Sequence, residues 1–144
     1  NAKKAMLKRK IFDYGGAQAI LTTKGLLEQL ERVLDKAISV DHEEVLRLLS
    51  ESGWQREKLV ASGVTQRWDA YKERIAVTVE FSLIDAIQRD FLRALWWKHL
   101  AKMDALVCIV PMAKEPTFSS VVNNIQVFSA ILTFPILVVG VESS

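Results

Sequence analysis

The run from Asp104 to Val110 is apolar after its first residue, and Pro111 ends it. A short segment without a polar face is typical of a β-strand buried on both sides, as in a parallel sheet covered by helices. A second segment of this kind extends from Ile136 to Val141. Because strands of this type need helices on both faces of their sheet, we expect an α/β architecture.

Residues 74–81 alternate in polarity, which predicts a further strand. One face of this strand is wholly apolar and consists of Ile75, Val77, Val79 and Phe81. The other face carries Ala76, Thr78 and Glu80. The segment 65–71 before it is also predicted to be extended, so that the two segments suggest a hairpin.

Helices are predicted around these strands. Apolar residues recur at helical spacing through residues 26–37, and Thr22 or Thr23 is a suitable N-cap. A second helix is expected to begin at Asp41, with a glutamate three residues later as in a capping box, and to end at Gly53.

A long helix is predicted over residues 82–102. Its core side is expected to carry Ile84, Ile87, Phe91, Leu95 and Trp96. Residues 118–133 are predicted to form a loop followed by a helix. The resulting order of strands and helices favours a central mixed sheet flanked by helices.

The composition fits one globular domain over residues 1–144. The net charge of +2 permits nucleic-acid binding without arguing for it. The one cysteine, Cys108, excludes an internal disulfide and fits a reducing compartment such as the cytoplasm. No stretch reaches the length of about 18 apolar residues that a membrane-spanning helix needs, so no membrane partner is expected.

An acidic residue within an otherwise apolar strand costs free energy unless it has a partner or a purpose, and Glu80 is such a residue. A hairpin would place Asp69 beside Thr78 and Glu80. Two carboxylates from adjacent strands suit Mg²⁺, which takes one or two protein carboxylates together with phosphate oxygens and water. A metal held in this way supports phosphodiester hydrolysis. On these residues alone the alternative of two exposed acids on an edge strand stays open.

Motifs of several other enzyme classes are absent from the sequence. The chain has no GxGxxG or GxxxxGK[ST] segment, no CxxC pair and no GxSxG segment. This argues against nucleotide-binding, zinc-site and serine-hydrolase functions. His42, near a predicted helix start, is expected to be exposed to solvent.

The sequence resembles the BglII and BstYI type II restriction endonucleases along nearly its whole length. The strongest segment is Trp68-Asp69 followed by Glu73-Arg74-Ile75-Ala76-Val77-Thr78-Val79-Glu80-Phe81-Ser82, which is similar to the catalytic hairpin of that family. Further matching segments are Ile11-Phe12-Asp13-Tyr14, Val110-Pro111-Met112, Ser119-Ser120 and Phe134-Pro135-Ile136-Leu137-Val138-Val139-Gly140.

The resemblance implies the restriction-endonuclease-like fold of the PD-(D/E)xK nucleases. It also implies a Mg²⁺-dependent, site-specific deoxyribonuclease of a restriction–modification system that cuts double-stranded DNA as a homodimer. The N-terminal helices or the long helix would form the dimer contact. Asp69 matches the metal-binding aspartate of the family, and Glu80 matches the third position of its motif. Ser119 and Ser120 match a loop whose serines contact DNA bases in the family. The tyrosines that usually follow this pair are absent, and of the residues that follow instead, Asn123 and Asn124 are also expected to face bases or phosphates.

Thr78 departs from the pattern of the family, which has its second metal-binding glutamate at this position. A hydroxyl group can position water but cannot supply the charge that holds a divalent cation. One function is therefore an active endonuclease in which Asp69 and Glu80 bind the metal and Thr78 positions water. The alternative is a catalytically decayed DNA-binding homologue of the same fold, and a purely structural dimer is a third possibility.

Overall fold

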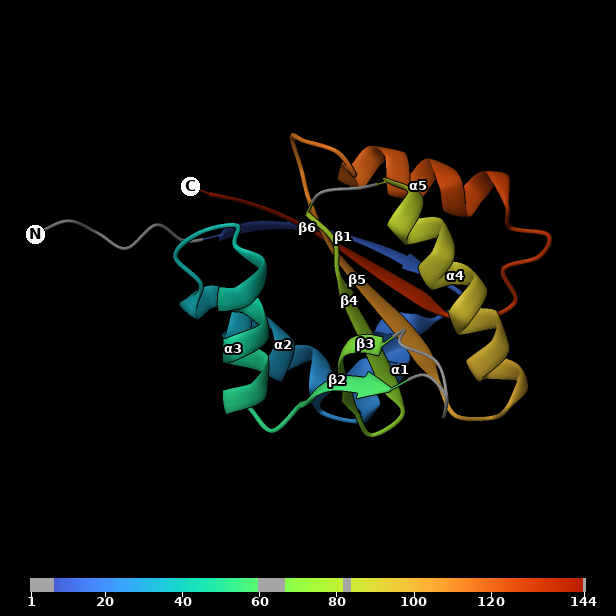
Figure 1. Cartoon of the computed structure of the whole chain (residues 1–144), viewed down its shortest axis with the longest axis horizontal. Helices are drawn as coiled ribbons and strands as arrows, with labels where there is room; N and C mark the ends of the chain where they lie inside the picture. The colour runs from blue at the N-terminus through green and yellow to red at the C-terminus, as the bar shows by residue number, and fades with distance from the viewer. Residues whose placement is uncertain (1–6, 60–66, 82–83, 144) are drawn as a thin grey trace, which may run out of the picture.

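The computed structural model describes residues 7–59, 67–81 and 84–143. Its strands are β1 (Leu7–Tyr14), β2 (Gln55–Leu59), β3 (Arg67–Lys72), β4 (Ile75–Val79), β5 (Ala105–Pro111) and β6 (Ile136–Ser143). Its helices are α1 (Ala17–Thr23), α2 (Leu26–Lys36), α3 (His42–Glu51), α4 (Ile84–His99) and α5 (Phe118–Val127). Figure 1 shows these elements as one layered arrangement around a twisted sheet.

The sheet is mixed, with the strand order β1-β6-β5-β4-β3-β2. Its centre is parallel, because β5 pairs with β4 on one side and with β6 on the other in the same direction. The edges are antiparallel through β1 against β6 and through β3 against β4 and β2. Every residue of β4 and β5 is buried, as the apolar runs predicted. The mixed sheet flanked by helices confirms the predicted fold class.

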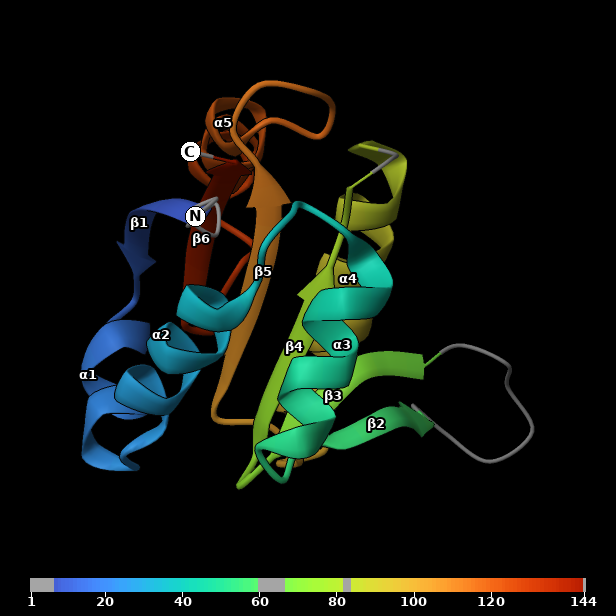
Figure 2. The ribbon, with the colours of Figure 1, turned by 90° about the vertical axis from the view of Figure 1, so that its left-hand side faces the viewer.

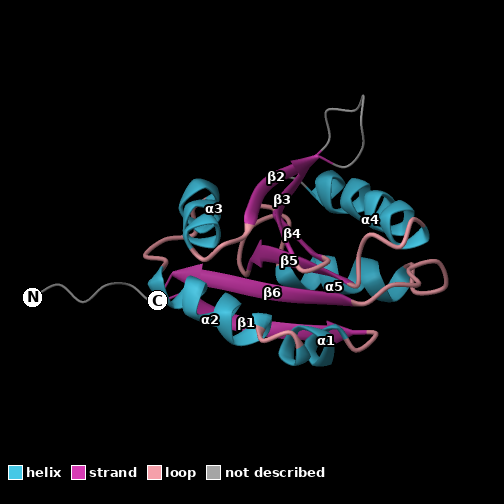
Figure 3. Cartoon of the chain, turned by 90° about the horizontal axis from the view of Figure 1, so that it is seen from below, coloured by secondary structure: helices cyan, strands magenta, loops and turns pink. Residues whose placement is uncertain are grey.

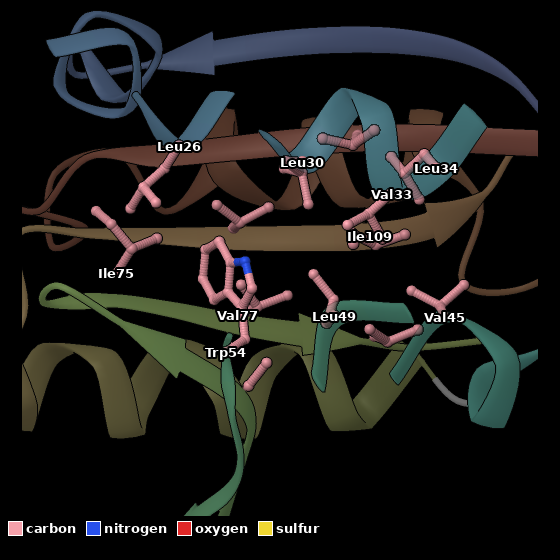
Figure 4. Close-up of a cluster of buried hydrophobic side chains, with 14 of the residues drawn as sticks. Leu26, Leu30, Val33, Leu34, Val45, Leu49, Trp54, Ile75, Val77 and Ile109 are labelled. Carbon is pink, nitrogen blue, oxygen red and sulfur yellow. The ribbon is translucent and has the colours of Figure 1, made fainter. Parts of the chain in front are cut away.

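Helices α1 to α3 cover one face of the sheet and helices α4 and α5 cover the other (Figure 2). Figure 3 shows α3 and α4 on opposite sides of the part of the sheet that β2, β3 and β4 form. On the first face, Leu30 of α2 and Leu49 of α3 pack toward Val77 and Ile109 of the sheet (Figure 4). Burying a side chain of this size contributes about 1.5–3 kcal/mol, so this layer holds the hairpin of β3 and β4 firmly in place.

Several boundaries differ from the prediction. Thr22 and Thr23 do not cap the helix predicted over residues 26–37, because their hydroxyls donate to the backbone oxygens of Gln18 and Ala19 within α1. Gly25, with a φ of 72°, precedes α2 instead. By contrast, Asp41 caps α3 as predicted and accepts a bond of 3.0 Å from the N–H of Glu44. Strand β2 was not predicted, since four of its five side chains are exposed.

Two errors concern the layer of α4 and α5. Trp96 is 43% exposed, and the next residue, Trp97, packs in the core in its place. Helix α5 begins at Phe118, where a loop was expected, and a loop follows it. The position of α5 also explains why residue 140 is a glycine, because a Cβ atom there would lie 2.8 Å from the Phe118 ring.

Residues 65–66 of the predicted extended segment and residues 82–83 of the predicted long helix lie outside the described residues.

In the part of the chain that the structure describes, no helix combines the length and the apolar character needed to cross a bilayer.

Candidate active site

A tight hairpin brings the predicted site residues together. The ladder between β3 and β4 joins residues 70–72 to residues 75–77, so Glu73 and Arg74 alone form the turn. Their φ angles are 47° and 68°, as in the two-residue turns that match the twist of a hairpin. Arg74 is held in this conformation because its Nε donates to Asp104 Oδ1 at 3.0 Å. The turn therefore fixes the register that sets Asp69 opposite the end of β4.

Asp69 lies at the end of the described ladder and continues it with its side chain. Its Oδ2 accepts a hydrogen bond of 2.7 Å from the backbone N–H of Val79. The other oxygen, Oδ1, lies 3.6 Å from Nε2 of His42, and the Asp69 side chain is 24% exposed. The carboxylate is thus fixed in orientation and still accessible from solvent.

Thr78 and Glu80 point to the same side of β4, toward α4. Thr78 Oγ1 lies 3.5 Å from Glu80 Oε2 and 2.8 Å from Asp90 Oδ2. Because a hydroxyl has one proton, the shorter contact identifies Asp90 as its acceptor. Glu80 is also held by its backbone, whose N–H donates to Ile109 O at 3.0 Å. The structure therefore brings Thr78 and Glu80 together as predicted and adds a third carboxylate.

Asp90 is the site residue that sequence reasoning missed. It comes from α4, is 2% exposed, and forms an ion pair with Arg93 one helical turn later. A signal was present in the sequence, since Asp90 falls at helical spacing from Ile87 and Ala94, in the stripe that faces the core. An aspartate in such a stripe is costly unless it is partnered, which marks it for attention.

The site crowds negative charge in a poorly hydrated place. Burial, together with the neighbouring Asp90 and Asp69 carboxylates, raises the pKa of Glu80 to about 8. Burial also raises the pKa of Asp90, while the Arg93 guanidinium and the Thr78 hydroxyl oppose this shift. Two carboxyl groups so close together share protons at neutral pH. Binding a cation would relieve the same crowding.

His42 is a second residue whose place differs from the prediction. It was expected to be a solvent-exposed residue, yet it is half-buried with its ring beside the Asp69 carboxylate. The hydrogen bond to Asp69 is the main reason that the pKa of His42 is raised, and burial opposes it. Asp41 positions this residue, because it caps the helix that begins with His42. Helix α3 thereby reaches the site from the opposite face of the sheet.

The donor set suits a hard cation such as Mg²⁺, which prefers oxygen ligands. Asp69 and Glu80 supply carboxylate oxygens from neighbouring strands, and Thr78 supplies a hydroxyl oxygen. Among residues 7–59, 67–81 and 84–143 no three His, Cys, Asp or Glu side chains are arranged to hold a metal as they stand. Mg²⁺ needs only one or two protein carboxylates, so the residues present fit it.

The four residues predicted to contact DNA lie on α5 and not on a loop. Ser120 and Asn124 are engaged locally: Asn124 Nδ2 donates to Ser120 O at 2.8 Å, and Gln88 of α4 donates to Asn124 Oδ1. Ser119 and Asn123 are exposed and lie one turn apart. In the described part of the chain, no hydrogen bond joins these four residues to the carboxylates of the site. Because β4 and β5 run parallel, the start of α5 nevertheless lies at the same end of the sheet as Glu80.

Comparisons with known proteins relate the chain to restriction endonucleases. A sequence model of the restriction endonuclease BglII/BglIII family matches residues 9–141. The crystal structure of restriction endonuclease BglII complexed with a DNA 16-mer superposes with a TM-score of 0.75 at 17% identity, covering 92% of this chain and 77% of that one. A search of curated proteins returned no match.

The mixed sheet with helices on both faces is thus the restriction-endonuclease fold, as the likeness to BglII shows. The chain belongs to the BglII/BglIII family of restriction endonucleases, because the match to that family spans almost all of its length. This confirms the resemblance found in the sequence.

Proposed function

We propose that the chain is a Mg²⁺-dependent type II restriction endonuclease that hydrolyses double-stranded DNA at a specific site, in the cytoplasm, as part of a restriction–modification system. The observation that carries this proposal is the hairpin that holds Asp69, Thr78 and Glu80 in one cluster, in a chain of a restriction endonuclease family. Asp69 and Glu80 are the proposed metal ligands.

Bound Mg²⁺ supplies positive charge that stabilises the developing charge on the phosphodiester and lowers the pKa of an attacking water. The chain itself orients the ligands. The Val79 N–H fixes one oxygen of Asp69, and the other oxygen, which lies beside the His42 ring, is the one that could bind the cation. Burial and the neighbouring carboxylates raise the pKa of Glu80, and this group would lose its proton on binding a cation. The Thr78 hydroxyl donates a hydrogen bond to Asp90, so its oxygen lone pairs remain to accept a hydrogen bond from water and orient it.

Helix α5 is the proposed DNA contact of each protomer. Ser119 and Asn123 are exposed and can reach bases or phosphates directly, whereas Ser120 and Asn124 must first give up their present bonds. The BglII structure in the comparison holds DNA, which supports a DNA-binding role for the same fold here.

A homodimer is proposed because a twofold protein matches a palindromic site. The apolar faces of α2 and α3 are buried against the sheet. Helix α4 instead leaves Leu92 and Trp96 exposed, beside a cleft lined by Phe128 and Ile131 from the segment after α5. This continuous apolar surface favours the long helix over the N-terminal helices as the dimer contact.

Cleavage of plasmid DNA with and without Mg²⁺ tests the proposal. Wild type should convert supercoiled plasmids that contain its site into linear fragments with Mg²⁺ and leave them intact with a chelator. Asp69→Asn should reduce cleavage by at least about a hundredfold. Losing a residue that only hydrogen-bonds to a metal ligand costs about 10–100-fold in activity, and Asp69 is itself a proposed ligand. DNA binding in a gel shift without any cleavage would instead establish the decayed homologue, for which the threonine at position 78 is the supporting observation.

A further inference from the structure

Asp90 places a carboxyl group where packing alone would favour an apolar side chain. It is 2% exposed and lies in the apolar stripe of α4, between Ile87 and Ala94. Removing a carboxylate from water costs several kcal/mol even after its surroundings relax. A helix that needed only packing at this position would be more stable with an apolar residue. The buried carboxylate therefore has a partner or task beyond packing.

Its position indicates that task. Asp90 Oδ2 lies 2.8 Å from the Thr78 hydroxyl, on the side of β4 that carries Glu80. The Asp90 carboxylate lies one hydrogen bond beyond the Thr78 hydroxyl. This is about as far from the backbone of position 78 as the carboxylate of a glutamate at that position would extend. The short Thr78 side chain leaves this space to Asp90, and its proton holds the aspartate in place.

The Arg93 guanidinium compensates the negative charge of the Asp90 carboxylate. It pairs with Asp90 through a terminal guanidinium nitrogen, and its guanidinium lies 5.7 Å from the centre of the Trp68 ring. The buried Arg93 Nε and Trp68 Nε1 have no hydrogen-bond partner among the described residues. Arg93 is therefore placed to neutralise Asp90 in the metal-free protein, and its hydrogen bonding is incomplete in that state.

We propose that Asp90 is a further metal-binding carboxylate of this endonuclease beside Asp69 and Glu80, supplied from α4 in place of a glutamate at position 78. Thr78 and Arg93 are positioning residues that orient Asp90. This inference rests on the proposed function, because it assigns a ligand to the same cation. It differs in adding a carboxylate from a helix, outside the hairpin that holds Asp69.

Metal binding by the full chain, measured by isothermal titration calorimetry with Mg²⁺ and with Ca²⁺, tests this without relying on cleavage. Asp90→Asn should weaken metal binding at least about tenfold. Losing a residue that only hydrogen-bonds to a metal ligand already weakens binding by about this factor, so the loss of a ligand should cost no less. The double variant Thr78→Glu with Asp90→Asn returns the carboxylate to the strand and should restore binding to within a few-fold of wild type. Asp85→Asn, the same chemical change at an exposed position of α4, should bind as wild type.

The outcomes separate the two proposals. If Asp69→Asn loses metal while Asp90→Asn binds as wild type, the endonuclease site stands and the role of Asp90 is overturned. If both variants bind as wild type, there is no metal site and the proposed function fails as well. Should Asp90→Asn not fold, the double variant decides: binding supports the inference, and a folded protein that does not bind overturns it.

Discussion

At the scale of single residues, Glu80 makes the metal-free site unfavourable at neutral and high pH. Its pKa is raised from 4.5 to about 8 by burial and by its carboxylate neighbours. The folded chain therefore keeps a proton that the unfolded chain has released between these pH values. By linkage, this group lowers the free energy of unfolding as the pH rises from about 5 to about 8. Carboxyl groups whose pKa is shifted by burial and by charged neighbours are often found at functional sites.

Glu80→Gln should remove this pH dependence, because the amide does not titrate. In a chelator, the variant is expected to match wild type near pH 5 and to exceed it at pH 8.5 by on the order of 1 kcal/mol, after discounting for the exposed part of the side chain. Urea denaturation across this pH range measures the difference. Glu31→Gln on α2 is the matched control. A gap between Glu80→Gln and wild type that does not widen with pH would contradict the crowding described here.

The site also shows which residues sequence reasoning can find. Asp69, Thr78 and Glu80 were predicted because a hairpin and strand alternation place them, and both are local features of the sequence. Asp90 joins them only through the packing of α4 on β4, a contact between residues 12 positions apart that no local period specifies. His42 is farther away in the sequence and belongs to α3, which lies on the other face of the sheet from α4. Long-range packing therefore completes the site that local pattern outlines.

At the scale of elements, the N-terminus of α3 is the part of the first layer that reaches the site. Asp41 caps the helix, and His42 then places its ring against Asp69. The local capping signal was readable in the sequence, whereas the contact with Asp69 depends on how α3 lies on the sheet. The other element-scale errors have the same origin. Trp96 and Trp97 are equally apolar, and only the packing angle of α4 decides which of them is buried.

Asp69→Asn should lower the pKa of His42, since the hydrogen bond to Asp69 is the largest cause of its elevation. In wild type the raised value means that His42 stabilises the fold while it is protonated, and this contribution is lost as the pH rises through the folded pKa. Titration of the two histidine C–H signals by NMR measures the shift, with His99 at the end of α4 as an internal reference. An unchanged His42 titration would show that α3 does not approach the hairpin as described.

At the scale of the whole molecule, the two layers present different outer surfaces. The layer of α1 to α3 buries most of its apolar side chains and exposes Ile38 at 49%. The layer of α4 and α5 exposes Leu92 at 66% and Ile131 at 56%, on either side of one cleft. Exposed apolar surface of this kind on a folded chain marks an interaction surface. A twofold contact through it would set two copies of the site in the symmetry of a palindrome.

Leu92→Glu should dissociate the proposed dimer, because a contact through α4 would bury an unpaired charge from each protomer. We expect the dimer dissociation constant to rise by roughly a hundredfold, which corresponds to about 2.8 kcal/mol. Analytical ultracentrifugation measures this constant, and circular dichroism checks that the fold is kept, since Leu92 lies on the exposed side of α4. Ile38→Glu makes the same change on the other layer and should leave the dimer intact.

On plasmid DNA, the monomeric variant should nick one strand slowly and no longer produce linear product, because each protomer holds one site. If Ile38→Glu dissociates the dimer and Leu92→Glu does not, the contact lies on the N-terminal helices, and the surface of α4 has another use.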